Sequence, residues 1–138
     1  MIISIISSSK IGSWNIPQRG QNFINNYYAI NNNMKIELNT SEELFFNNFK
    51  MLKKMIKNYK KNELKIIFCS SLQLANVLDE NKFINFFKNF ELHFALELEN
   101  GKGVKFLKKI FAEIKHFSNK NRINIENIKS YNDLFKKY

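Results

Sequence analysis

The stretch LKIIFCSS, residues 64–71, is an aliphatic and aromatic run that is followed directly by two serines. A short apolar run of this kind, rich in isoleucine, predicts a buried strand over residues 64–69. Three more runs of the same character predict strands at residues 2–6, 34–38 and 92–98. Because the run at 64–69 ends at Ser70 and Ser71, we expect these two hydroxyls at the edge of a sheet.

Helical patterns lie between the predicted strands. The first covers residues 17–32, with Asn15 as its cap and Pro17 in its first turn, where the missing N–H costs nothing. Its apolar stripe, expected to be buried, consists of Phe23, Tyr27 and Ile30. Two later helices are expected at residues 80–90 and 104–117.

The remaining predicted helix has the clearest local signal. It begins at a capping box formed by Thr40 and Glu43. Its apolar residues recur at helical spacing and predict one buried face: Phe45, Phe49, Leu52, Ile56 and Tyr59.

The alternation of strands and helices decides the fold class. It predicts one α/β domain over residues 1–138, in which helices cover both faces of a mostly parallel sheet of four or five strands. Right-handed crossovers make this a three-layer α/β/α fold, flavodoxin-like or resolvase-like. Near the end of the chain, INIENI at residues 123–128 predicts a last strand or extended segment. A capping box at Ser130 and Asp133 then predicts a short C-terminal helix.

The formal net charge of +10 raises the question of an acidic partner such as nucleic acid. The excess residues are Lys, Asn, Ile, Phe and Tyr, whose codons are rich in A and T, so the base composition of the gene explains them equally well. Among 22 basic residues only Arg19 and Arg122 are arginines, whereas recognition of bases and phosphates favours arginine. Nucleic acid is therefore not the expected partner, and most lysines are expected on solvated helix faces.

The cellular compartment follows from two features. The single cysteine, Cys69, cannot form an internal disulfide, and its apolar neighbours predict a buried, inert thiol. The N-terminal run MIISIISSSK, residues 1–10, is too short to span a bilayer and has no basic region before it. We therefore expect a cytoplasmic protein without a membrane span.

The loop after the first predicted strand is a candidate anion site. It contains Ser8 and Ser9 and leads into a helix start at Pro17, whose free N–H groups and positive dipole end favour an anion. Arg19 adds a guanidinium for a phosphate or carboxylate. Four amides spaced three or four residues apart share a polar helix face: Gln18, Gln21, Asn22 and Asn25. Of these, Gln18 is expected to help hold the anion, and Gln21 and Asn22 are expected to bind hydroxyls. An ordinary loop explains the same residues as well, because neither GxGxxG nor GxxxxGK[ST] is present.

The fourth predicted strand, ELHFALELE at residues 91–99, supplies the candidate catalytic residues. Alternation puts His93 and Glu97 on the same face. At about 3.3 Å per residue they lie roughly 13 Å apart, so they cannot form a hydrogen-bonded dyad. Glu97, near the carboxyl end, is the better candidate for proton transfer, and His93 lies deeper. A strand histidine is also commonly a satisfied core residue, and that alternative stays open.

The third strand adds hydroxyl groups to the same crevice. Ser70 and Ser71 are candidate substrate-binding residues, although no G-x-S-x-G motif surrounds them. One cysteine and two separated histidines show no metal-ligand spacing, so neither a metal nor a cofactor is expected. Acid–base chemistry requires neither.

Two segments carry a resemblance to a known family. IPQRGQNFINNYY at residues 16–28, the serine after the third strand and ELHFALE at residues 91–97 occur in that order. Together they resemble the sporadic carbohydrate cluster protein family, small bacterial proteins encoded within gene clusters for surface polysaccharides. The resemblance implies a role in making cell-surface sugars, and it points to Pro17, Gln18, Gln21, Asn22, His93 and Glu97. The first loop reads SSSKIGSWN where that family has Gly-Ser-Arg-Pro, which leaves Lys10 as the basic residue available there.

These observations support three hypotheses. The leading one is a small enzyme of surface-carbohydrate biosynthesis, an isomerase, epimerase or lyase, that binds a phosphorylated, nucleotide-linked or acidic sugar. The second is a non-catalytic binding or scaffold subunit whose Phe-rich helices pair with another enzyme or with a second copy. The third is a nucleic-acid-binding domain, because the order of strand, polar loop and Gln-rich helix is also similar to the catalytic domain of serine recombinases.

Overall fold

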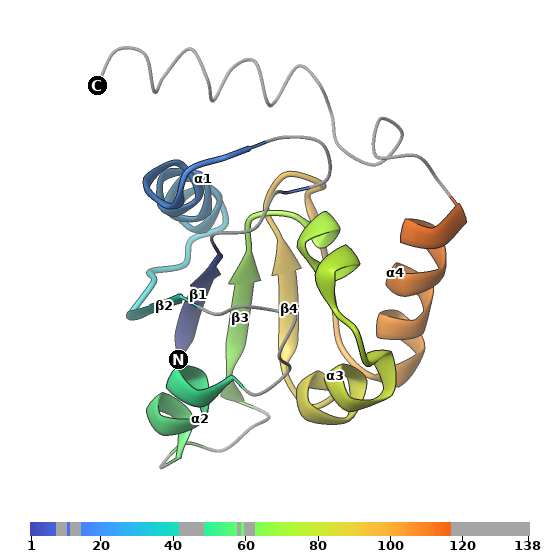
Figure 1. Cartoon of the computed structure of the whole chain (residues 1–138). Helices are drawn as coiled ribbons and strands as arrows, with labels where there is room; N and C mark the ends of the chain where they lie inside the picture. Colours follow the sequence, from blue (N-terminus) through green and yellow to red (C-terminus); the bar gives the residue numbers. More distant parts are fainter. Residues whose placement is uncertain (8–10, 12–14, 42–48, 58, 60–62, 117–138) are drawn as a thin grey trace.

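Five strands form one sheet in the order β2-β1-β3-β4-β5. The computed structural model describes residues 1–7, 11, 15–41, 49–57, 59 and 63–116. The strands are β1 (Ile2–Ile6), β2 (Leu38–Ser41), β3 (Lys65–Phe68), β4 (Glu91–Phe94) and β5 (Glu99–Gly101). The first four are parallel to one another, and β5 is antiparallel to β4. Figure 1 shows β2, β1, β3 and β4 side by side in that order.

The helices lie on both faces of this sheet. They are α1 (Gln18–Asn31), α2 (Lys50–Ile56), the 3₁₀ helix η3 (Ser71–Asn76), α3 (Glu80–Phe87) and α4 (Val104–His116). Side chains of α2, α3 and α4 pack into one buried cluster, and side chains of α1 pack into a second. The predicted fold class is therefore confirmed as a mixed α/β fold with a mostly parallel sheet, compatible with three α/β/α layers.

The central strand, β3, could be predicted from the sequence because both of its faces are buried. In β3, Ile66 and Phe68 contribute to the cluster beneath α2, α3 and α4, whereas Ile67 and the following Cys69 belong to the cluster beneath α1. Because both faces are covered, the strand is a continuous apolar run instead of an alternating one. The predicted burial of Cys69 is confirmed.

Five predicted elements, at residues 2–6, 17–32, 64–69, 80–90 and 104–117, agree with the structure to within a few residues, and the second strand does not. The strand expected at 34–38 is instead β2, which pairs with β1 so that Thr40 lies opposite Ile5. The proposed capping box is therefore wrong at Thr40, because a β-branched residue there extends the sheet and begins no helix. Helix α2 begins after Phe49, and Tyr59 lies beyond its end with 47% of its surface exposed. Glu43 and Phe45 lie outside the described residues, as do the elements predicted after residue 116.

The fourth strand is shorter than expected and is followed by a strand that the sequence did not reveal. β4 ends at Phe94, and residues 95–98 form a turn in which Leu98 has a left-handed backbone with φ of 56°. The chain then returns as β5, so that Glu99 lies opposite Phe94. Strict alternation was thus the wrong pattern for residues 95–98. Glu97 reaches its position from a turn.

Helix α1 buries a different face from the one predicted. The residues that it buries are Gly20, Gln21, Ile24, Asn25, Tyr28 and Ala29. Tyr27 is 47% exposed and Ile30 is 71% exposed, so the stripe predicted to be buried faces largely outward. The reason is that the amides of Gln21 and Asn25 hydrogen-bond to the sheet, which removes most of the cost of burying them.

Among the described residues, none of the helices has the length and apolar character needed to cross a membrane.

The packing of the aromatic side chains beneath α3 can be tested by mutating Phe87. Phe87 is fully buried, with its ring centroid 4.3 Å from that of Phe83 and 4.9 Å from that of Phe49. Phe87→Ala should lower the free energy of unfolding by about 3–5 kcal/mol, because it removes a ring that the surroundings cannot replace. Chemical denaturation followed by circular dichroism measures this loss. Leu78→Ala, at a residue 78% exposed, is the control and should change it by about 0.5 kcal/mol or less. A loss below about 1 kcal/mol for Phe87→Ala would contradict the packing.

Candidate functional site

The carboxyl ends of β1 and β3 lie next to each other at the centre of the sheet. β1 has β2 on one side and β3 on the other, so the direction of the chain's crossovers reverses between β1 and β3. Ligands of open α/β sheets bind at such a reversal, beyond the carboxyl ends of the strands. Ser7 follows β1 at this edge, and Ser70 and Ser71 follow β3.

Ser7 is held from two directions by buried glutamine amides. Its N–H donates to Oε1 of Gln21 at 3.0 Å, and its carbonyl accepts from Nε2 of Gln21 at 2.7 Å. The second Nε2 hydrogen of Gln21 goes to the carbonyl of Ile16, at 2.9 Å. From the other side, Nε2 of Gln73 donates to the Ser7 hydroxyl at 3.2 Å. Gln21 therefore fixes the backbone around the start of α1, with both of its amide hydrogens used on the main chain.

Ser70 connects this network to the turn after β4. Its N–H donates to Oε1 of Gln73 at 3.1 Å, and its hydroxyl accepts from the N–H of Leu72 at 3.0 Å, which forms a capping box at the start of η3. The same hydroxyl donates to Oε2 of Glu97 at 2.8 Å. Ser70 thus joins two segments that are far apart in the sequence.

Glu97 has both carboxylate oxygens engaged. Oε2 accepts from the Ser70 hydroxyl, and Oε1 accepts from the N–H of Ser71. Its side chain is half-buried, whereas both serines are buried. These two donors fix the orientation of the carboxylate. A fixed, partly exposed carboxylate is the arrangement that a general base requires.

The other predicted residues of this edge are placed as follows. Pro17, Gln18 and Arg19 are exposed at the start of α1, where Nε2 of Gln18 donates to the hydroxyl of Ser41 at 3.0 Å. Asn22 is half-buried, and its Oδ1 atom has no hydrogen-bond partner. Ser8 and Ser9 lie outside the described residues. Hydrogen bonds thus connect the start of α1 with Glu97 through Ser7, Gln73 and Ser70.

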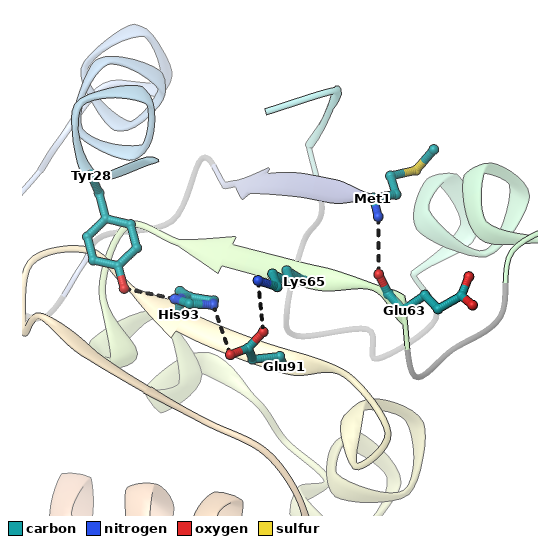
Figure 2. Close-up of polar contacts among 6 residues, drawn as sticks. All are labelled: Met1, Tyr28, Glu63, Lys65, Glu91 and His93. Carbon is teal, nitrogen blue, oxygen red and sulfur yellow. Dashed lines mark hydrogen bonds and ion pairs between the residues drawn. The ribbon is translucent and has the colours of Figure 1, made fainter. Parts of the chain in front are cut away.

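His93 belongs to a different group of side chains (Figure 2). Its Nδ1 lies 2.8 Å from the Tyr28 hydroxyl of α1, and its Nε2 lies 3.7 Å from Oε1 of Glu91. Oε2 of Glu91 is in turn 3.5 Å from Nζ of Lys65. The side chain of His93 is deep, as the sequence predicts, and its partners come from α1, β3 and β4, with no bond to Glu97 in the described structure.

Sequence reasoning did not find the partners of His93, although the strand register offered a signal. Lys65 and Glu91 begin β3 and β4 and lie directly opposite each other, so their charges meet on the face that α1 covers. Tyr28 was missed because it stands next to Tyr27, which was assigned to the buried face in its place. Gln21 and Asn25 are the buried amides of α1, and they lie on the same face of the helix as Tyr28. If they had been recognised as buried, Tyr28 would have been assigned to the buried face.

Burial controls the titration of these groups. Burial lowers the pKa of His93 below its usual value, an effect that the carboxylate of Glu91 opposes and the ammonium of Lys65 reinforces. Burial likewise raises the pKa of Tyr28, against the hydrogen bond from Asn100. The neutral imidazole that results shares one hydrogen bond with the Tyr28 hydroxyl through Nδ1, whose donor depends on the ring tautomer, and its Nε2 faces Glu91. Burial also raises the pKa of Cys69 well above its usual value, as does the nearby charge of Glu97, which keeps the thiol protonated.

Two cavities lie away from the carboxyl edge. One of about 590 Å³ is at the opposite edge of the sheet, between Met1, Glu37 and Glu63. Another of about 210 Å³ lies between η3 and α4, with the ion pair of Glu80 and Lys115 at its rim. Within the described part of the chain, no three His, Cys, Asp or Glu side chains gather in a way that could hold a metal ion.

Comparisons with protein-family models, with curated proteins and with solved structures found nothing that matches this chain.

His93 generates a prediction about pH. Its folded pKa lies below the ordinary value of 6.5, so the unfolded chain binds more protons once the pH falls through that value. The stabilisation due to His93 is therefore complete above about pH 6.5 and is lost as the pH falls towards the folded pKa. His93→Gln keeps a hydrogen-bond acceptor for Tyr28 but cannot titrate, so its melting temperature should fall less than that of the wild type between about pH 7 and pH 5.

The matched control is His116→Gln, because His116 is exposed near the end of α4. Melting temperatures of the three proteins over the same pH series make the comparison. Parallel curves for the wild type and His93→Gln would show that His93 is not the group responsible.

Proposed function

We propose that this chain is a small cytoplasmic enzyme of bacterial cell-surface carbohydrate biosynthesis, with its site at the carboxyl edge of β1 and β3. Its substrate is a phosphorylated, nucleotide-linked or acidic sugar, and its chemistry is acid–base, of the isomerase, epimerase or lyase type. The observation that supports this most strongly is the carboxylate of Glu97, fixed by Ser70 and Ser71 and still partly exposed at the reversal point of the sheet.

Proton transfer in this proposal rests on Glu97. Isomerisation, epimerisation and elimination begin when a base removes a proton from a carbon or hydroxyl of the sugar, and a carboxylate held in one orientation serves this purpose. Arg19, exposed at the start of α1 on the same edge, supplies a charge for the acidic or phosphorylated part of the substrate. His93 as a second proton-transfer group stays a prediction, since its ring contacts Tyr28 and Glu91.

The choice of sugars as the substrate class comes from the resemblance. The first segment, IPQRGQNFINNYY at residues 16–28, covers the start of α1 and most of that helix. The second, ELHFALE at residues 91–97, covers β4 and the turn after it. The hydrogen-bond network connects these two segments. The amide of Gln18, exposed at the same edge, is also a group of the kind that binds sugar hydroxyls. The resemblance and the network therefore support the same location.

A second candidate is the non-catalytic scaffold subunit. The specific observation that favours it is the apolar surface of α1, where Ile30 is 71% exposed. In that case Glu97 acts only as a clamp that fastens the β4 turn to η3. The experiment below separates the two candidates, because a clamp transfers no proton.

The test is a thermal-shift screen of the full chain against sugar phosphates, nucleotide sugars and uronic acids. A ligand at about 100 times its Kd stabilises the folded state by about 2.7 kcal/mol, so one of these classes should raise the melting temperature by several degrees. With that ligand in D₂O, proton NMR should show the loss of a sugar C–H signal through exchange with solvent.

Glu97→Gln should abolish this exchange, because an amide cannot accept the proton. The variant can keep its amide oxygen on the N–H of Ser71, but its N–H₂ group then replaces the oxygen that accepts from the Ser70 hydroxyl, at a cost of about 1–3 kcal/mol, so it is assayed well below its own melting temperature. Glu63→Gln, exposed near the opposite edge, is the control and should exchange at the wild-type rate. Stabilisation by none of the three ligand classes, or exchange at the wild-type rate in Glu97→Gln, would reject the proposed function.

A further inference from the structure

Helix α1 differs from an ordinary surface helix, because it buries two amides beside its apolar core residues and leaves two large apolar side chains exposed. Gln21 and Asn25 are fully buried against the sheet, whereas Tyr27 and Ile30 are 47% and 71% exposed. A helix on the surface of a globular domain normally turns its apolar stripe towards the core. Leaving such a stripe in water forgoes about 1.5–3 kcal/mol for each large apolar side chain that could be buried.

Beyond the first turn, which exposes Gln18 and Arg19, the same surface is free of charge in a strongly basic chain. Between Arg19 and Lys35 the sequence has no charged residue, although the formal net charge of the chain is +10. After that first turn, the exposed residues of α1 and of the turn that follows the helix are Asn26, Tyr27, Ile30, Asn31, Asn32 and Asn33. By contrast, the exposed positions of α3 and α4 include Lys82, Lys88, Lys105, Lys108 and Lys109. Two copies of this chain would repel each other across the lysine-bearing helices, and at α1 they would not.

We propose that the outward face of α1 binds a second copy of this chain, as a two-fold symmetric homodimer. In a two-fold interface the same patch meets itself, so the patch must be self-complementary. Asparagine satisfies this condition, because its side chain carries both donors and an acceptor, whereas lysine does not. Tyr27 stacks on Phe23, with ring centroids 6.5 Å apart and planes at 13°, and Ile30 follows one turn later, which gives a continuous apolar centre.

The composition and size of the patch fit this partner. Interfaces are enriched in tyrosine and depleted of charged residues at their centres. Helix α1 has 14 residues and is therefore about 21 Å long, which places an α1–α1 contact at the small end of stable interfaces. The dimer is accordingly weak, with a dissociation constant in the micromolar to millimolar range.

Sedimentation equilibrium of the full chain tests the proposal over protein concentrations from about 10 μM to about 1 mM. The wild type should move from the 16.4 kDa monomer towards twice that mass. Ile30→Lys places like charges on both sides of the two-fold contact and should raise the dissociation constant at least tenfold. The control, Leu78→Lys, adds the same charge at an apolar residue outside α1 that is 78% exposed, and it should leave the dissociation constant unchanged.

The response to salt provides a second readout. Added salt screens the repulsion between two chains of net charge +10 without weakening an uncharged contact, so the dimer should be as strong or stronger at 0.5 M than at about 0.05 M NaCl. A wild type that stays monomeric throughout, a dimer that Ile30→Lys leaves intact, or a dimer that Leu78→Lys weakens equally would overturn the proposal. A monomer would indicate that a different molecule covers α1. Circular dichroism melting of both variants, each altered at an exposed residue, confirms that they are folded.

Discussion

The structure depends on the hydrogen bonds by which α1 is attached to the sheet. Gln21, Asn25 and Tyr28 follow one another at successive turns of the helix and reach Ser7, Ser4 and His93 respectively. These three bonds extend from the carboxyl end of β1 to the middle of β4. They set the rotation of α1 about its axis, and that rotation determines both what the helix contributes to the carboxyl edge and what it shows to solvent. We refer to Gln21, Asn25 and Tyr28 with their three partners as the polar seam.

The polar seam is a costly way to hold a helix. A buried polar group is tolerated only when it is hydrogen-bonded, and an apolar contact of the same shape often stabilises as much. Among the described residues, Oδ1 of Asn25 and Nε2 of His93 are buried and have no hydrogen-bond partner, so the seam is not fully satisfied there. What the polar seam provides is a defined position of α1 on the sheet, because an amide hydrogen-bonded to the Ser7 backbone restricts the position of that loop far more than an apolar contact could. In our account this position aligns the start of α1 with the edge where Ser70 holds Glu97.

The sequence was a good guide where burial is apolar on both sides and a poor one where it is polar. The runs that became β1 and β3 followed directly from their continuous apolar character, and α3 and α4 followed from helical periodicity. For α1 the same periodicity selected Tyr27 and Ile30 and turned the helix the wrong way, because hydropathy cannot foresee that buried amides will find partners. Thr40 was misassigned for a related reason, since its capping pattern also fits a strand. Among the candidate site residues, Ser70, Ser71 and Glu97 came together because strand ends in a parallel sheet meet at one edge, whereas His93 went to a cluster set by strand register.

The polar seam can be tested directly by NMR of the isotope-labelled full chain. The side-chain amide protons of Gln21 and Asn25 should exchange slowly with water and show nuclear Overhauser contacts to Ser7 and Ser4 respectively, while the ring protons of Tyr27 show none to the strands. Rapid exchange of both amides, together with contacts from Tyr27 and Ile30 to β1 or β3, would mean that α1 is turned the other way, and would contradict the account of the carboxyl edge and of the outward face alike.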